Sequence, residues 1–423
     1  MRNWKLIVSA AVALHGAVVC AAEFDPAATA TNQLGLELFR EAAVGTKTGN
    51  LLLSPFSIQS ALAMTYAGAD GETRAEMAKV LHFPQEDAPL TGSFGALRNA
   101  LDATAKKSVA TAKQRQQSKG SVDTIEWHIA NRLFGQRGYQ FRQPFLALVK
   151  DGYGAPFELL DFRGAAEPAR GKINAWVEEQ TQKKIRDLIP SGGVDKDTRL
   201  VLVNALYVKA PWEMKFEKAA TQARPFHVGG AEAKDVPAMS QTANFGYAKR
   251  DGFAALTLPY LGRDLQLLIL LPDDRSGLDA LMKEVTADVL RDCAKMEARR
   301  IELYLPRFRI EGGTLPLAKM LQALGMKTAF DQPPQSANFD RIAPRKPDDY
   351  LAISKIFHKT FLALDEEGTE AAAATAVVML APLAAMPIEK PPLVVRVDHP
   401  FLFAIQHRES GACLFLGRVV DPR

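Results

Sequence analysis

The sequence predicts an α+β fold, because most helix-like segments come early in the chain and most strand-like segments come late. Apolar residues recur with helical spacing at 31–44, 55–66, 72–81, 94–103, 167–184, 276–299 and 315–324. Runs typical of β-strands lie at 124–134, 198–208, 255–271, 300–310, 351–365, 393–397, 401–406 and 413–420. This segregation favours large, mostly antiparallel sheets over an alternating, doubly wound sheet.

The first 22 residues differ from the rest of the chain. Arg2 and Lys5 precede an apolar run, Leu6 to Val19, that ends in the small residues of the segment 20–22. The run has about fourteen residues and is shorter than the ~20 that a membrane-spanning helix needs. We therefore expect residues 1–22 to be a secretory signal peptide and the mature protein to be periplasmic or extracellular. Lipidation of Cys20 is a less favoured alternative.

One helix start is marked by two successive residues. The hydroxyl of Ser54 can cap a helix, and Pro55 suits the first helical position because its missing N–H is not needed there. We expect a helix to begin at Pro55.

Composition excludes several classes of protein. The chain has 423 residues, 47% of them hydrophobic, which is enough for a large core. Its net charge of +4 is too small to drive nucleic-acid binding. Three cysteines cannot form a disulfide framework, and we expect Cys293 and Cys413 to be buried free thiols, with a disulfide between them as the less favoured alternative.

A polar, low-complexity tract runs from 103 to 123. It carries several basic residues and no aromatic residue, so we expect a flexible, solvated insertion. A less favoured alternative is weak binding of polyanions such as sulfated glycans. The residues that would bind them are Lys106, Lys107, Lys113, Arg115 and Lys119.

Local catalytic and metal-binding motifs are not found in the sequence. It has no G-x-S-x-G, H-E-x-x-H, phosphate-loop or G-x-G-x-x-G motif, and its seven histidines are scattered. We expect no enzymatic activity, no metal site and no cofactor. A catalytic triad assembled from distant residues would leave no such motif and is merely unsupported.

The most unusual segment runs from Asp365 to Pro392. Within it, residues 371–388 carry no charge, yet alanines, threonines and two prolines make a membrane helix unsuitable. With a period of two, residues 369, 371, 373, 375, 377 and 379 form one small or apolar face. Alanine has poor strand propensity, so this strand would gain stability mainly when neighbours enclose it. The pattern predicts a strand that can enter a sheet.

The run EEGTEAAAAT at 366–375 resembles, almost residue for residue, the proximal hinge of the inhibitory serpins. Further blocks resemble the same family, at 50–73, 130–141, 173–190, 198–217, 236–248 and 395–422. The resemblance implies one domain over 23–423 with three β-sheets, about nine helices and an exposed reactive loop at 366–392. It also implies suicide inhibition of a serine protease, or of a cysteine protease, by a protein that we expect to be a monomer.

In the mechanism that the resemblance implies, the loop is attacked as a substrate and forms an acyl-enzyme. The cleaved loop then enters the large sheet as an added strand, a recognised form of strand addition that releases stored strain. The uncleaved state must therefore be metastable.

The resemblance also assigns roles to individual residues. Gly368 is the pivot of the hinge, and Thr369 is the first side chain that insertion buries. Arg307 is the basic partner of Glu366, and Trp212 lies near the insertion point, the breach. The hinge comprises Glu366, Gly368, Thr369, Ala371, Ala373 and Thr375. The polar cluster that holds the central strands together, the shutter, comprises Ser54, Ser57, Asn204 and His358.

The scissile bond departs from the family pattern. The usual spacing from Glu366 makes Pro382 the last residue before the cut, where proline is a poor residue. A cut after Ala381 is no better, because Pro382 would then be the first residue after the cut. We therefore expect cleavage between Leu383 and Ala384, with Ala384–Ala385 as a close alternative. Leu383 predicts an elastase-, chymotrypsin- or subtilisin-like target. The alternative function is that of a non-inhibitory serpin acting as a binding or structural protein.

Overall fold

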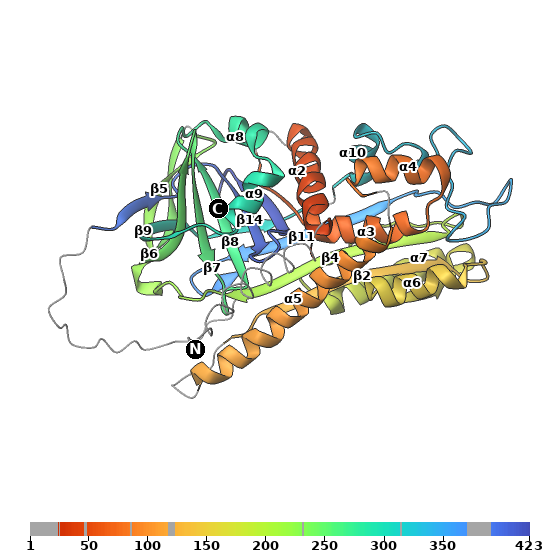
Figure 1. Ribbon diagram of the computed structural model, residues 1–423, viewed down its shortest axis with the longest axis horizontal. Coiled ribbons are helices and arrows are strands. Elements are labelled where there is room, and N and C mark those ends of the chain that lie inside the picture. The colour runs from red at the N-terminus through yellow and green to blue at the C-terminus, as the bar shows by residue number, and fades with distance from the viewer. Residues whose placement is uncertain are drawn as a thin grey trace, which may run out of the picture.

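A computed structural model describes residues 24, 26–45, 49–84, 87–116, 123–230, 232–313, 315–369 and 391–423. These residues form nine α-helices and two sheets, which confirms the α+β class (Figure 1). The helices are α2 (Ala27–Gly45), α3 (Pro55–Ala67), α4 (Gly71–Val80), α5 (Asp87–Gln116), α6 (Gln143–Tyr153), α7 (Phe162–Gln180), α8 (Leu278–Glu284), α9 (Ala287–Cys293) and α10 (Leu317–Ala323). Within the described residues, none of these helices is long and apolar enough to cross a membrane.

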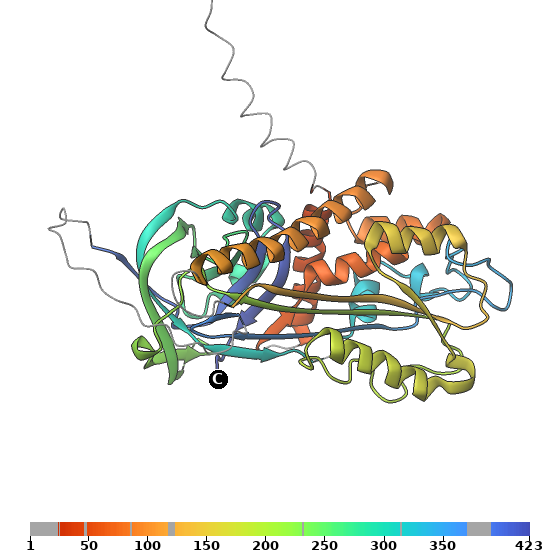
Figure 2. The same ribbon diagram turned by 90° about the horizontal axis from the view of Figure 1, so that it is seen from below.

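A six-stranded sheet has the order β10-β11-β12-β4-β2-β3. Its strands are β2 (Glu126–Gln136), β3 (Phe157–Leu160), β4 (Leu200–Pro211), β10 (Phe308–Glu311), β11 (Ile356–Leu364) and β12 (Gly368–Thr369). Helix α7 covers one face of this sheet, while α3, α5 and α6 lie on the other face (Figure 2). Side chains such as Ile173, Val203 and Phe357 form a separate buried cluster beneath α7.

The remaining strands form a second sheet, which has nine strands. Its strands are β1 (Leu51–Leu53), β5 (Gln222–Val228), β6 (Glu232–Arg250), β7 (Phe253–Pro259), β8 (Leu265–Pro272), β9 (Ala298–Pro306), β13 (Leu393–Arg396), β14 (Phe401–His407) and β15 (Cys413–Val419). The resemblance implies three sheets, whereas the described strands form two. The long strand β6 explains the difference, because it pairs with β5, β7 and β9 along successive parts of its length.

The basic tract expected to be flexible is largely helical, so that expectation is wrong for 103–116. These residues continue α5, whose inward side chains Leu101, Thr104, Ser108 and Ala112 recur with helical spacing and are buried. The Ser108 hydroxyl accepts a hydrogen bond from the Ile125 N–H at 3.0 Å, which fixes the end of the helix against the chain before β2. Residues 117–122 lie outside the described part of the chain.

Three other expected elements are divided, and one helix and four strands are added. A turn at Tyr260–Asp264 splits the long strand expected at 255–271 into β7 and β8. The helix expected at 276–299 is two short helices followed by the start of β9, and the run 300–310 is divided between β9 and β10. Helix α6 and the strands β1, β3, β5 and β6 were not expected. Cys293 and Cys413 are buried free thiols, as predicted.

Candidate loop-insertion site

Strands β4 and β11 are neighbours along only part of their length. They pair in parallel where 356–360 lies beside 202–206. Further along, β12 lies between them, with Thr369 opposite Leu364 of β11 and Ala210 of β4. The chain thus leaves β11, turns at 365–367 and returns between the two strands.

Gly368 permits the close approach of β12 to β4. Its φ is +150°, and a Cβ atom there would lie 2.2 Å from the carbonyl oxygen of Ala210. Only glycine fits this position without moving the backbone of β4.

Thr369 is held by a buried aromatic pair. It is 1% exposed, and its hydroxyl lies 2.6 Å from the hydroxyl of Tyr260. The Tyr260 ring stacks on Trp212 with 4.7 Å between ring centroids. The indole N–H of Trp212 donates to the Asp365 carbonyl at 2.9 Å. Trp212 therefore contacts both the turn before β12 and the ring that holds Thr369.

Glu366 lies where the resemblance implies a partner for Arg307. The two side chains are 3.5 Å apart, with Glu366 4% exposed and Arg307 45% exposed. Glu366 also accepts a hydrogen bond from the Thr221 hydroxyl at 2.6 Å. Because the Arg307 side chain is 45% exposed, solvent weakens the ion pair, and we expect the hydrogen bond from Thr221 to matter as much.

The neighbouring acids of the turn are also paired. Glu367 contacts Lys215 at 2.5 Å and Lys218 at 3.3 Å. Asp365 accepts from the backbone N–H groups of Glu367 and Gly368. Burial raises the pKa of the Asp365 carboxyl, and the neighbouring acids add to that rise. The turn thus places three acids together beside the start of β12.

Two of the other shutter residues, Ser57 and His358, contact Asn204 of β4. Its Oδ1 accepts from the Ser57 hydroxyl at 2.5 Å and faces His358 Nδ1 at 3.3 Å. Its amide group donates to the Ser57 carbonyl and to Asn131 Oδ1 of β2. The network joins α3, β2, β4 and β11 across the stretch where β4 and β11 pair.

Ser54 completes the network from the N-terminus of α3. It caps the helix by accepting from the Ser57 N–H, as the Ser54–Pro55 pattern predicts. Its backbone N–H donates to His358 Nε2 at 3.2 Å, so His358 is neutral with its proton on Nδ1. Burial lowers the pKa of His358 to about 3.

Five of the predicted site residues lie outside the described part of the chain. They are Ala371, Ala373, Thr375, Leu383 and Ala384. Their roles stay predictions. The described hinge residues Glu366, Gly368 and Thr369 lie together with Trp212 and Arg307, whereas the shutter forms a second group further along β4 and β11.

Sequence reasoning missed several contributors to these two groups. Tyr260, Thr221 and Lys215 contact the hinge from segments that are more than a hundred positions away in the chain. Asn131 joins the shutter from β2. Only Tyr260 had a sequence signal, because Gly262 two positions later marks the turn that ends β7.

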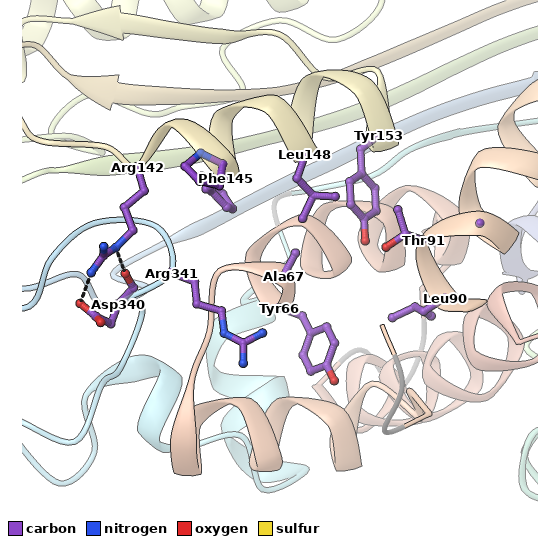
Figure 3. Close-up of a pocket in the computed structure, with 12 residues that line it drawn as sticks. Tyr66, Ala67, Leu90, Thr91, Arg142, Phe145, Leu148, Tyr153, Asp340 and Arg341 are labelled. Carbon is purple, nitrogen blue, oxygen red and sulfur yellow. Dashed lines mark hydrogen bonds and ion pairs between the residues drawn. The ribbon is translucent and has the colours of Figure 1, made fainter. Parts of the chain in front are cut away.

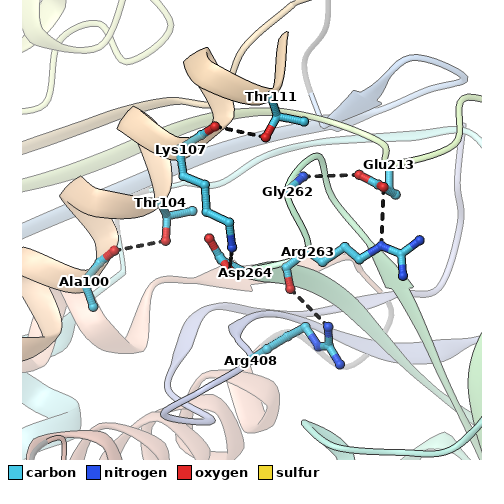
Figure 4. Close-up of polar contacts among 9 residues, drawn as sticks. All are labelled: Ala100, Thr104, Lys107, Thr111, Glu213, Gly262, Arg263, Asp264 and Arg408. Carbon is cyan, nitrogen blue, oxygen red and sulfur yellow. Dashed lines mark hydrogen bonds and ion pairs between the residues drawn. The ribbon is translucent and has the colours of Figure 1, made fainter. Parts of the chain in front are cut away.

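The basic residues of α5 do not form a single patch. Lys106 and Lys113 are exposed and lie two helical turns apart on one face. Lys107 points elsewhere and pairs with Asp264 at 2.6 Å, beside Arg263 and Arg408 (Figure 4). The side chains of Arg115 and Lys119 lie outside the described part of the structure.

Comparison with known proteins identifies the family. The family model "Serpin (serine protease inhibitor)" matches residues 29–422. Leukocyte elastase inhibitor of Bos taurus is 38% identical over 93% of this chain and 98% of its own length. Serpin B10 of Otolemur garnettii is 36% identical over 94% of this chain and 100% of its own length.

Solved structures give the same result. The structure of uncleaved ovalbumin matches with a TM-score of 0.76 and 31% identity, over 94% of this chain and 100% of that one. Cleaved Serpin 42Da matches with a TM-score of 0.77 and 28% identity, over 96% of this chain and 100% of that one. The chain therefore belongs to the serpin family of serine protease inhibitors.

Proposed function

We propose that this protein is a secreted inhibitor that traps its target protease covalently and inserts its cleaved loop into the six-stranded sheet. The observation that carries the proposal is β12, because Gly368 and Thr369 already pair with the two strands that insertion would separate. Residues after Thr369 would extend this strand toward the shutter. Each would add main-chain hydrogen bonds, and Val377 and Met379 would each contribute ~1.5–3 kcal/mol on full burial.

The covalent step follows from the chemistry of serine proteases. The target's serine hydroxyl would attack the carbonyl carbon of Leu383 and form an ester. The peptide bond to Ala384 would break, and the serine proton would pass through the protease's general base to the new amino group of Ala384. Insertion before hydrolysis of the ester would carry the bound protease along with Leu383.

The shutter sets the resistance to insertion. For the loop to pass, β4 must move away from β11, which breaks the contact of Asn204 with His358. These groups are buried, so breaking the network without replacing its hydrogen bonds costs free energy. We propose that cleavage permits this change because the free loop end then supplies a new strand.

A gel assay tests the proposal and the target class together. The mature chain is mixed separately with elastase, chymotrypsin, subtilisin and trypsin and is run under denaturing conditions. We expect an adduct near the summed masses with a protease that accepts leucine, and a released fragment that begins at Ala384. Leu383→Arg should move adduct formation to trypsin. Cleaved chain without adduct in every mixture would instead favour a non-inhibitory binding or structural protein.

Secretion is a separate part of the proposal, because residues 1–22 lie outside the described part of the chain. It rests on the basic start, the apolar run and the small residues before Glu23. N-terminal sequencing of exported protein should begin at Glu23. Mass spectrometry of the same material would reveal a lipid on Cys20 if the alternative were correct.

We further propose that α5 binds sulfated polyanions weakly, because Lys106 and Lys113 are exposed on one face of the helix. Salt-sensitive binding of dextran sulfate should weaken when both lysines are replaced by methionine. Lys107→Met should have a smaller effect, since Asp264 already pairs with Lys107. Equal effects from the two variants would contradict this assignment.

A further inference from the structure

A polar hollow of about 270 Å³ lies at the end of β2, and we call it the basal hollow. It is lined by the turn at 136–140, by Arg163 at the start of α7 and by the loop at 344–349. At this end of β4, Leu200 pairs with Gly135 of β2, whereas β12 pairs with the other end of β4. The basal hollow is therefore remote from the hinge, at the opposite end of the six-stranded sheet (Figure 1).

Three cations line the basal hollow, and each comes from a different segment of the chain. They are Arg137, Arg163 and Lys346, and all three are exposed. Within the part of the chain that the structure describes, none of these side chains has an acidic partner at ion-pair distance. Like charges that share a small space attract an anion into it.

Two acids lie close to these cations, and both have other partners. Asp349 also lines the hollow, but it pairs with Arg199 at 3.3 Å. Asp161 caps α7 by accepting from the Gly164 N–H at 2.9 Å, and it also accepts from the Gln136 amide at 3.4 Å. The hollow therefore keeps an excess of positive charge.

A buried glutamine holds the two arginines of the hollow in place. Gln136 is 6% exposed, and its amide group donates to the Arg137 carbonyl at 2.9 Å. Its Oε1 accepts from the Arg163 N–H, also at 2.9 Å. The Arg137 N–H in turn donates to the Leu160 carbonyl at 2.8 Å. The backbones of both arginines are thus fixed relative to each other before any ligand binds, which lowers the entropic cost of binding.

A larger hollow shows why unpaired cations are distinctive. A space of about 810 Å³ lies between α3, α5 and α6, and its lining is mainly apolar (Figure 3). The two arginines at that space have acidic partners, since Arg142 pairs with Asp340 and Arg341 pairs with Asp70, each at 3.0 Å. An anion there would have to compete with these acids, whereas in the basal hollow it would not.

The arrangement of the cations favours a phosphate or sulfate group over a carboxylate. Guanidinium groups donate pairs of N–H bonds to oxyanions, and an ammonium group adds a point charge. A phosphate or sulfate group has oxygens in several directions and can accept from three separate side chains, whereas a carboxylate has two oxygens in one plane. The volume also leaves room for a small polar body, since one water molecule takes up only ~30 Å³.

We propose that the basal hollow binds a phosphate or sulfate group, either as the free ion or carried by a small polar molecule such as a sugar. Arg137 and Arg163 donate to the oxygens of the group, and Lys346 supplies the third cation. The site is separate from the lysines of α5, and it does not rest on the proposed inhibitory function.

Calorimetric titration of the mature chain at constant ionic strength tests the proposal. Inorganic phosphate, inorganic sulfate and glucose 6-phosphate are the probes, and glucose and acetate are the controls. We expect saturable binding of the probes, no binding of glucose and weaker binding of acetate. Tighter binding of glucose 6-phosphate than of inorganic phosphate would identify a carried group, and equal binding would identify the free ion. No saturable binding of any probe, or equal binding of acetate, would overturn the proposal.

Two substitutions locate the site. Arg137→Met and Arg163→Met each remove one exposed cation from the hollow, and we expect each to weaken phosphate binding roughly tenfold, as for a lost charged hydrogen bond. Arg345→Met is the matched control, because it removes the same charge beside Lys346 from a side chain that does not line the hollow. It should change the affinity by less than about twofold, since solvent screens the more distant charge. Equal losses in all three variants would contradict a site at this place.

A third substitution should act in the opposite direction. Asp349→Asn removes the acid that lines the hollow and releases Arg199, so phosphate should bind more tightly to this variant than to the parent. Thermal unfolding checks that each variant is folded. Weaker or unchanged binding by folded Asp349→Asn would count against an anion in the basal hollow. The titrations contain no protease, so their outcome is independent of whether an adduct forms.

Discussion

At the scale of single residues, the sequence predicts which side chains matter better than it predicts their partners. The period-two pattern places Thr369 on the small or apolar face, the resemblance implies that insertion buries this residue, and the structure buries it. The contact of Thr369 with Tyr260 could not be predicted, because a contact between residues 109 positions apart depends on how the sheets pack. The same holds for Asn131, whose role depends on the register between β2 and β4.

The first residue-scale prediction concerns Thr369→Arg. An arginine there would place an unpaired cation in a site that is 1% exposed, at a cost of several kcal/mol. We expect the variant to be cleaved by the target protease without forming an adduct. Thr369→Ser keeps the hydroxyl that contacts Tyr260 and should retain the adduct. An unchanged adduct yield on gels for Thr369→Arg would refute the role of this residue in insertion.

The second prediction concerns the pH dependence that His358 confers. Its pKa is about 3 in the folded protein and about 6.5 when unfolded, so the unfolded chain binds more protons between these values. The full contribution of neutral His358 to the free energy of unfolding is therefore present above about pH 6.5. It is lost as the pH falls toward 3, at up to about 1.4 kcal/mol per pH unit.

Denaturant unfolding between pH 7 and pH 4 measures this dependence. His358→Gln should be less stable at pH 7 but should lose less stability on acidification than the parent. Buried His407, whose pKa is lowered to about 4, remains in both proteins and acts as an internal reference. Identical pH slopes for the two proteins would show that His358 is not buried in its neutral form.

At the scale of elements, several helices with a clear apolar period were predicted, whereas the ends of elements and some whole strands, such as β6, were not. The helix that begins at Pro55 was predicted because Ser54 and Pro55 have local roles. The helical continuation of α5 over 103–116 was missed because its inward side chains are small or polar. Their burial depends on the neighbouring β2 segment, so composition alone suggested a solvated tract.

The element-scale prediction concerns β12. Gly368→Ala adds a Cβ at φ +150° and 2.2 Å from the Ala210 carbonyl oxygen, so β12 or β4 must shift. We expect a loss of about 1–3 kcal/mol in the uncleaved protein, measured by denaturant unfolding. Gly171→Ala in α7 is the control, because its added Cβ meets nothing within 4 Å and alanine favours a helix. Equal stabilities for the two variants would contradict the close approach of β12 to β4.

At the scale of the whole molecule, sheet order lay beyond local reasoning. The six-stranded sheet brings together strands from four distant parts of the chain, and β12 enters it beside the strand that precedes it. Family resemblance implied three sheets and about nine helices without a strand order, whereas periodicity predicted only the α+β class. The pairing of β12 with both neighbours leads to our central claim, which is that the uncleaved chain is held short of its most stable arrangement.

Thermal unfolding of the intact protein and of protein cut once at Leu383 tests that claim most directly. We expect the cut form to melt at a clearly higher temperature, because its loop adds a strand between β4 and β11. Equal melting temperatures, or a lower one for the cut form, would contradict it.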